Sequence, residues 1–296
     1  MAENLDHAEW KGTTGGMPWM QRSLVWMLAT IDQRILYGVL LFVVPFYMIF
    51  SHMGYISQYH FFRERFGESC IRAFFHVYVN HFKFGQIIID RFAVYGGRKF
   101  KLEFDGFDLW TEVARQDDGF VQVSSHIGNY ELAGYSLKSQ NKAFNALVFL
   151  GETETVMKNR NKVFAPNNIK MVPVMPDMSH IFELNTALSN GEIVSMPGDR
   201  IFGSQKSVTH EFLGKEAKFP VGPFSLAATR GSRMLSVFCM KKDWQTYYIR
   251  VRELPMGDSG KRSDQINSLS AAFVSELEKI VREYPTEWFN YYDFWK

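Results

Sequence analysis

The chain has little of what holds a small disulfide-bonded or metal-bound protein together. Among its 296 residues only Cys70 and Cys239 are cysteines, and neither a CxxC pair nor a histidine cluster at metal-ligand spacing occurs. These absences exclude a disulfide framework and a structural zinc site, and they indicate a reducing compartment. We therefore expect a functional site without a metal.

An excess of charge of either sign is also missing. The 33 basic and 31 acidic residues leave a net charge of +2, which argues against a nucleic-acid partner because such proteins carry strongly basic surfaces. The sequence has neither an internal repeat nor a low-complexity segment. A cleavable signal peptide is not evident either, since the first thirty residues are polar and carry acidic residues where a basic n-region is needed.

Aromatic residues and one apolar run stand out instead. Aromatic residues make up 16% of the chain, which suits a deep apolar pocket, a membrane surface or a phenylalanine-rich core. The run at about 35–50, ILYGVLLFVVPFYMIF, has no charge but falls short of the ~20 residues that span a bilayer comfortably. It can be a tilted span, an anchor in one leaflet, or a core helix kinked at Pro45. We favour anchoring because the run is apolar on all sides.

Two regions are predicted along the chain. Residues 1–99 form an N-terminal helical region with the apolar anchor at about 35–50, including two helices over 59–92. Residues 100–296 alternate between strand and helix patterns. That alternation predicts an α/β catalytic domain, in which a layered mixed or parallel sheet is flanked by helices. The expected strands are 101–107, 119–125, 143–149, 169–174, 192–196, 234–240 and 247–254, and the expected helices are 109–115, 132–137, 155–164, 178–189, 224–229 and 263–284.

The segment His126-Ile127-Gly128-Asn129-Tyr130-Glu131 carries the clearest chemical signal. It lies between a predicted strand and a predicted helix, and catalytic groups collect at the carboxyl ends of strands in α/β sheets. A neutral imidazole is a competent base near pH 7, and Glu131 folded back onto the other ring nitrogen of His126 would fix its tautomer. Taken alone, such a pair is more often a structural contact than a catalytic one, so other segments must decide.

Three more segments carry weaker signals. Gly198-Asp199-Arg200 follows a predicted strand, where the aspartate can aim the guanidinium at an anion or a developing oxyanion, although an ordinary loop turn explains it as well. Lys158, Arg160 and Lys162 can dock an acidic partner or a phosphate, or form a solvated helix face. Pro220 belongs to a rigid apolar turn that can line a pocket wall, or it serves only the turn.

Together these segments resemble the lysophospholipid acyltransferase superfamily, and more closely its lipid A late-acyltransferase branch. The HX4(D/E) box of that family is matched at 125–131, its Asp-Arg box at 198–200 and its proline-containing turn at 219–223. Its closing run of proline, tryptophan and further aromatics is matched at 285–295, a segment too apolar to be left in water. The apolar run at 35–50 also has the expected place. An HX4E box alone is weak, whereas four segments in order are specific.

The resemblance implies a membrane-associated acyltransferase. His126 would be the general base and Glu131 would orient it, while Arg200 and the backbone amides after Gly128 would stabilise the oxyanion. No metal or cofactor is implied beyond the acyl donor. The resemblance also implies substrate contacts, with no firm register for the arginine, at Asn129, Arg160, Asp199 and Pro220.

The implied partners are an acyl carrier protein or coenzyme A thioester as donor, a lipid acceptor and the membrane. A lipid A precursor is the leading acceptor, and an amino-acid lipid or a pigment or polyene precursor is the alternative. The implied location is the inner (cytoplasmic) membrane, with the catalytic domain on its cytoplasmic side. Two other classes stay open: a thioesterase-type hydrolase, in which the same base activates water, and a non-enzymatic lipid-binding envelope protein.

Overall fold

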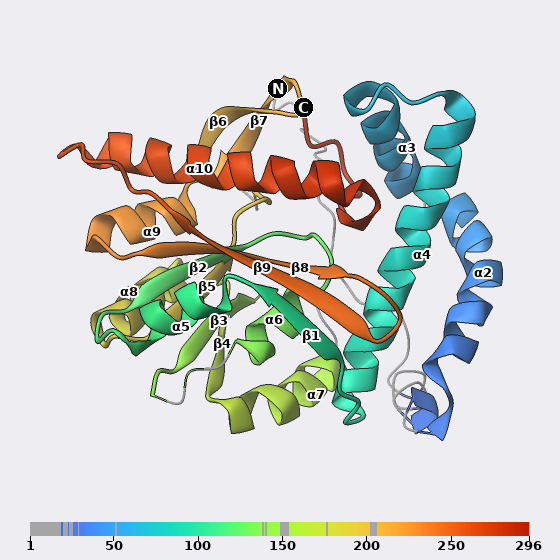
Figure 1. Ribbon diagram of the computed structural model, residues 1–296, viewed down its shortest axis with the longest axis horizontal. Coiled ribbons are helices and arrows are strands. Elements are labelled where there is room, and N and C mark those ends of the chain that lie inside the picture. Colours follow the sequence, from blue (N-terminus) through green and yellow to red (C-terminus); the bar gives the residue numbers. More distant parts are fainter. Residues whose placement is uncertain are drawn as a thin grey trace.

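The computed structural model describes residues 19, 23, 26–28, 30–50, 52–137, 139, 141–148, 154–175, 177–201 and 206–295. Within these ranges the chain builds one seven-stranded sheet with helices on both faces, and a separate two-stranded hairpin (Figure 1). The expected α/β class is therefore confirmed. The division at residue 99 stays a prediction.

The large sheet is mixed rather than wholly parallel. Its strand order is β1-β9-β8-β2-β5-β3-β4. Five strands run in one direction, while β9 pairs antiparallel with β8 and parallel with β1. The strands are β1 (Lys101–Asp105), β2 (Phe120–Ser124), β3 (Phe144–Val148), β4 (Ile169–Pro173), β5 (Ile193–Pro197), β8 (Met234–Lys241) and β9 (Thr246–Leu254).

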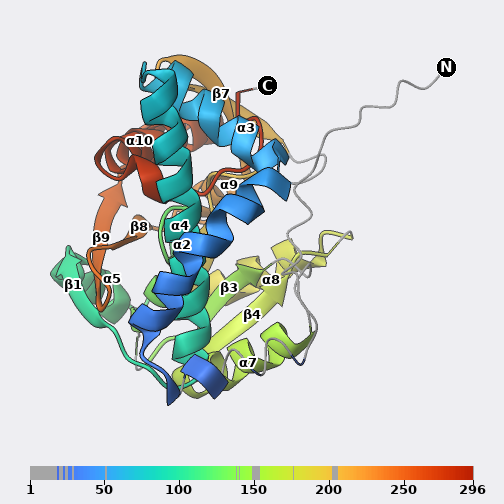
Figure 2. The same cartoon turned by 90° about the vertical axis from the view of Figure 1, so that its right-hand side faces the viewer.

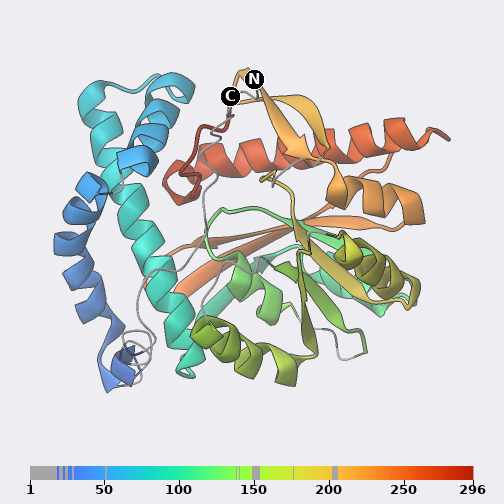
Figure 3. The same cartoon turned by 180° about the vertical axis from the view of Figure 1, so that it is seen from behind.

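Helices cover the sheet in two layers (Figures 1 and 3). The side chains of α5 (Phe107–Arg115), α6 (Tyr130–Ser136) and α7 (Glu154–Phe164) pack on one face. Those of α8 (Ser179–Ser189), α9 (Gly222–Arg230) and α10 (Arg262–Glu283) pack on the other. Strands β2 and β8 are buried along their whole length, which explains why they are continuous apolar runs rather than alternating ones.

The N-terminal part contributes α2 (Gln33–Phe50), α3 (His52–His60), a π-helical turn η1 (Phe61–Arg65) and α4 (Cys70–Tyr95). Two helical segments were expected over 59–92 and two are present: α3 continues into η1 up to Arg65, and the long helix α4 begins at Cys70. A break at Gly67, whose φ is +65°, precedes Ser69, and the Ser69 hydroxyl caps α4 by accepting from the Arg72 amide. The π-helical turn η1 directly continues α3.

Helix α2 lies along α4 at one side of the molecule (Figure 2). It buries one stripe, formed by Gln33, Tyr37, Val44 and Met48, and leaves most of its other side chains exposed. The interpretation as a core helix is therefore wrong, because a core helix is buried all round. Side chains of Gln33 and Tyr37 bond to the buried Asp90 of α4.

A hairpin of β6 (Ser207–Phe212) and β7 (Lys215–Pro220) was not anticipated. Its two-residue turn, Leu213-Gly214, has positive φ at both positions, which matches the right-handed twist of paired strands. In β6 the residues Val208, His210 and Phe212 are less exposed than the polar residues between them. This period of two is the sequence signal that could have revealed the strand. Two short 3-10 turns, η2 (Ala165–Asn167) and η3 (Pro285–Glu287), complete the described elements.

Candidate active site

The register between two parallel strands brings His126 beside Asp199. Ser124 at the end of β2 is paired with Pro197 at the end of β5, and the Gly198 amide donates to the Ser124 carbonyl at 2.8 Å. The chain segments leaving these neighbouring strands therefore stay side by side. This is the carboxyl edge of the sheet, where catalytic groups collect in α/β proteins.

Asp199 holds His126 at two points. Its Oδ2 accepts from the His126 backbone amide at 2.8 Å, and its Oδ1 lies 2.8 Å from Nδ1 of the imidazole. Because an ionised carboxylate can only accept, the ring proton is assigned to Nδ1 and the lone pair to Nε2. The pair therefore presents Nε2 as a proton acceptor.

The electrostatic surroundings keep His126 neutral and Asp199 ionised. Burial lowers the pKa of His126 below its ordinary value of 6.5, and the positive charge of Arg200 lowers it further, against the opposing effect of Asp199. Burial acts to raise the pKa of Asp199, but His126 and Arg200 outweigh it and the pKa is lowered. A neutral imidazole beside an anion is the protonation state that a general base needs.

Arg200 is buried in the same site. Its guanidinium donates to the Phe289 carbonyl at 2.5 Å and lies over the Tyr292 ring, 5.9 Å from the ring centre. Arg200 directly follows Asp199 in the chain, and its positive charge acts to lower the pKa of His126. A fixed guanidinium at this place is suited to an oxyanion that develops next to the base.

Glu131 does not contact His126 in the way the sequence analysis expected. Its carboxylate instead accepts from Arg160 at 3.0 Å and from the Tyr95 hydroxyl at 2.5 Å, and Arg91 lies 3.5 Å away. Burial acts to raise the pKa of Glu131, but the two arginines outweigh it and the pKa is lowered. Glu131 thus links α6 to α4 and α7, and Asp199 occupies the place at the imidazole that was expected for it.

Replacing Glu131 by glutamine should destabilise the protein. Two buried arginines would lose their counter-charge, and breaking a buried pair typically costs about 3–5 kcal/mol. We expect this loss in the free energy of unfolding measured by denaturant titration. Glu103→Gln is the matched control, because its pair with Lys242 is exposed and should contribute about 0–1 kcal/mol. Equal effects of the two variants would contradict this role of Glu131.

The backbone amides after Gly128 are also engaged elsewhere. Gly128 N–H donates to the Glu287 carbonyl at 2.9 Å and Asn129 N–H to the Cys239 carbonyl at 2.8 Å, so these two cannot form the expected oxyanion hole. Gly128 has φ +57°, and a Cβ there would lie 1.9 Å from the Cys239 oxygen, so only glycine fits. Asn129 is buried as the N-cap of α6, accepting from Leu132 N–H at 3.1 Å, instead of facing a substrate.

The remaining expected substrate contacts are not brought to His126. Arg160 is buried against Glu131, and its neighbours Lys158 and Lys162 are exposed on α7. Pro220 is buried at the end of β7, paired with Ser207. The structure therefore gathers His126, Asp199 and Arg200 and leaves Arg160 and Pro220 outside that group.

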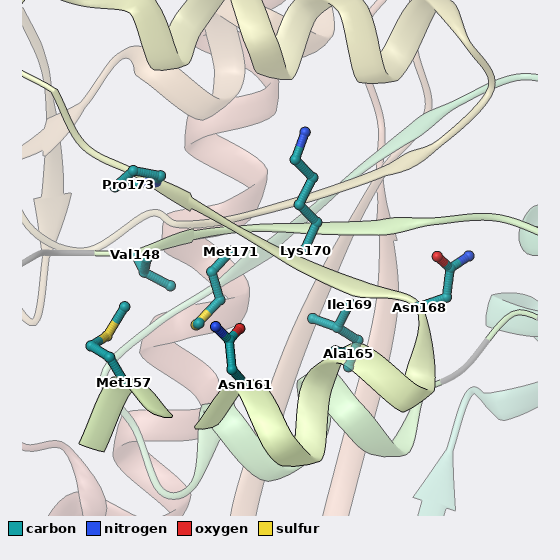
Figure 4. Close-up of a pocket in the computed structure, with 9 residues that line it drawn as sticks. All are labelled: Val148, Met157, Asn161, Ala165, Asn168, Ile169, Lys170, Met171 and Pro173. Carbon is teal, nitrogen blue, oxygen red and sulfur yellow. The ribbon is translucent and has the colours of Figure 1, made fainter. Parts of the chain in front are cut away.

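A cavity of about 530 Å³ lies at the edge of the sheet formed by β3 and β4, next to α7. The side chains of Met157, Asn161 and Met171 converge on it (Figure 4). His126, Asp199 and Arg200 are not among its lining residues, so it is not the site of the base chemistry. It was not anticipated from the sequence.

Trp288 also belongs to the site, although the sequence analysis named it only as part of an aromatic segment. The aromatic segment 285–295 packs on the domain, as expected, but it also enters the site through Trp288, whose indole N–H points to Asp199 Oδ2 at 3.3 Å. The Tyr292 hydroxyl lies 3.5 Å from the Asp199 carbonyl oxygen. A buried tryptophan needs an acceptor for its N–H, and this need is the only sequence signal for such a contact.

Comparison with known proteins places this geometry in context. A family model described as bacterial lipid A biosynthesis acyltransferase matches residues 90–296. The phosphatidylinositol mannoside acyltransferase of Mycobacterium tuberculosis (strain ATCC 25618 / H37Rv) is 21% identical over 173 residues, which cover 57% of this chain and 52% of that protein. The chain thus spans about half the length of the curated relative it matches.

A solved structure was also similar. The 1-acyl-sn-glycerophosphate (LPA) acyltransferase PlsC from Thermotoga maritima aligns with a TM-score of 0.40 and 14% sequence identity, covering 87% of this chain and 99% of that one.

Proposed function

Because the chain belongs to the bacterial lipid A biosynthesis acyltransferase family, whose model matches residues 90–296, we propose that it transfers a fatty acyl chain from a thioester to a hydroxyl or amine of a lipid acceptor. The contact of His126 Nδ1 with Asp199 at 2.8 Å carries the proposal. This contact leaves Nε2 as the base at a strand end, next to a buried arginine.

The proposed reaction is a direct acyl transfer. Nε2 of His126 removes the proton of the acceptor as its oxygen or nitrogen attacks the thioester carbonyl, and Asp199 stabilises the imidazolium that forms. Arg200 stabilises the negative charge on the carbonyl oxygen. Collapse of the tetrahedral intermediate breaks the carbon–sulfur bond, and His126 returns its proton to the leaving thiolate. No covalent acyl-enzyme is needed.

The proposed substrates follow from the family. A lipid A precursor is the leading acceptor, and the name of the mycobacterial relative supports a glycolipid hydroxyl as the acceptor class. Acyl carrier protein is the proposed donor. The exposed Lys158 and Lys162 of α7 are suited to an acidic carrier because opposite surface charges speed its encounter.

The experiment that tests this function separates transfer from hydrolysis. Purified protein is given a radiolabelled acyl carrier thioester with and without a lipid A precursor, and both acylated lipid and free fatty acid are measured. Acylated lipid that forms only with the acceptor is the expected result. Free fatty acid released at the same rate with and without acceptor would instead identify a thioesterase.

The proposed location is the cytoplasmic face of the inner membrane. Among the described residues α2 is one helix long and apolar enough to cross a membrane, judged by length and composition. Its polar end is docked on the domain, since Gln33 and Tyr37 contact the buried Asp90. We therefore propose that α2 lies in one leaflet with its apolar side in lipid. Exposed apolar side chains of α2 include Ile35, Val39, Phe42, Phe46, Ile49 and Phe50.

Charged residues on this face of α2 should abolish membrane binding. The double variant Phe42→Asp with Phe46→Asp removes two side chains that are 75% and 64% exposed, and burying each in lipid contributes about 1.5–3 kcal/mol. We expect partitioning into liposomes, measured by flotation, to fall at least about 100-fold. Phe182→Asp on α8, exposed by 74%, is the control and should float like the wild type. Unchanged flotation of the double variant would show that this face of α2 does not bind the membrane.

A further inference from the structure

The segment after α10 adds a short piece of strand to the backbone that carries His126. Phe289 N–H donates to the His126 carbonyl at 3.0 Å, and Gly128 N–H donates to the Glu287 carbonyl at 2.9 Å. Trp288 and Ile127 thus form an antiparallel bridge. Figure 1 shows this red segment running from α10 toward α3 and α4. The catalytic loop therefore has the last described segment of the chain as its neighbour.

This pairing sets the indole of Trp288 against Asp199. The indole N–H donates to Oδ2 at 3.3 Å, the same oxygen that accepts from the His126 amide at 2.8 Å. Oδ1 is thereby left to the imidazole. Two donors on one oxygen fix the plane of the carboxylate, and the ring nitrogen faces the other oxygen.

The indole itself is firmly held. Trp288 is fully buried, with ring centres 5.2 Å from Phe61 and 5.5 Å from Phe212. Its carbonyl accepts from the Asn80 side chain of α4 at 3.0 Å and lies 3.4 Å from that of Gln58 of α3. The N-terminal helical region and the β6–β7 hairpin thus fix the indole of Trp288. The only polar atom of this ring, the indole nitrogen, contacts Asp199, which is the partner of His126.

We propose that Trp288 is a positioning residue for His126, acting through the orientation and charge of Asp199. This inference rests on the proposed acyl transfer. The indole N–H disperses part of the carboxylate charge, so the aspartate stabilises the imidazolium less than an unrestrained one would. Without the indole, the carboxylate loses one of the two donors on Oδ2 that fix its plane. Its undispersed charge also holds a protonated His126 more strongly.

The test compares Trp288→Phe with Trp295→Phe. Trp295 stacks in the same aromatic cluster, 5.9 Å from Trp288, but its indole donates to the Phe212 carbonyl. For Trp288→Phe we expect kcat to fall roughly 10-fold, as for a lost hydrogen bond to a charge, with KM unchanged. The acid limb of the kcat/KM profile should move to higher pH. Trp295→Phe should leave that limb in place.

A purely structural role would lower the folded fraction and leave the acid limb where it is. Wild-type kcat and an unmoved limb in Trp288→Phe would overturn the proposal, as would effects equal to those of Trp295→Phe. If Trp288→Phe does not fold, benzothienylalanine at position 288 keeps the ring shape and lacks the N–H, and the same outcomes apply.

A readout that needs no substrate separates this proposal from the proposed function. The titration of His126 is followed by NMR in wild type and in the Trp288 variant, with His126→Ala to assign the signal. An upward shift of the His126 pKa supports the positioning role even if no acylated lipid forms in the transfer assay. An unshifted pKa contradicts it even if transfer is observed.

Discussion

Replacing His126 by alanine is expected to lower kcat/KM for acyl transfer by ~10²–10⁴-fold. The change removes the proton acceptor, while the buried Arg200 and the rest of the site remain. Initial rates of acylated lipid formation, at saturating thioester, measure the effect. The imidazole is only 16% exposed as a side chain, so unfolding curves of the variant are recorded beside the rates.

His210→Ala is the matched control for the loss of a histidine. His210 is partly buried and contacts the Ser270 hydroxyl at 2.7 Å, away from the strand ends that carry His126 and Asp199. Its variant should retain wild-type rates. Full activity of His126→Ala would show that His126 is not the base of the transfer. A wild type that forms no acylated lipid would instead favour a non-enzymatic lipid-binding protein.

Asp199→Asn is expected to reduce kcat by a similar ~10²–10⁴-fold. The His126 amide and the Trp288 indole both donate to Oδ2, so the asparagine oxygen must take that place and its NH₂ group must face Nδ1. An NH₂ group donates, so the imidazole is forced to carry its proton on Nε2. The base is then blocked although the fold is kept. Rates at several pH values, with unfolding curves as the check on folding, measure this effect.

Glu131→Gln is the comparison for Asp199→Asn, at a temperature at which both variants are folded. Loss of kcat in Glu131→Gln together with retained kcat in Asp199→Asn would restore Glu131 as the partner of His126. The reverse is expected, because Glu131 bonds to Arg160 and Tyr95.

The direction in which wild-type activity changes with pH can be predicted. Burial and the charge of Arg200 lower the pKa of His126 below 6.5, and only the neutral imidazole is a base. Activity is therefore fully present above this lowered pKa and is lost as the pH falls through it. The acid limb of kcat/KM should lie below pH 6.5 in the wild type.

Most of the fold could be predicted because its elements carry strong local patterns. Strand β8 is a continuous apolar run, and α10 repeats apolar residues at helical spacing, so both lie within a few residues of where they were expected. The β6–β7 hairpin could not be predicted as easily, since its strands expose one polar side and carry no continuous apolar run. The buried stripe of α2 could not be predicted, because Gln33 and Tyr37 look polar until Asp90 is placed beside them.

The pairing of His126 was predicted with the wrong carboxylate. His126 and Glu131 are five residues apart, which suggested that they meet, yet the turn at Gly128 and the start of α6 send Glu131 toward Arg160. Asp199 is distant in the sequence and reaches His126 because β2 and β5 are neighbours. Strand order depends on contacts along the whole chain, so a single sequence shows that both segments end strands but not that these strands are adjacent.

The strand-like pairing of Trp288 with Ile127 also has a consequence for biosynthesis. His126 leaves the ribosome about 160 residues before Trp288, on the order of ten seconds earlier at ordinary rates of translation. Asp199 follows 73 residues after His126, and it then still lacks the indole that fixes it, which comes 89 residues later. The partner of the base is therefore fully fixed only once the segment around Trp288 has docked beside Ile127.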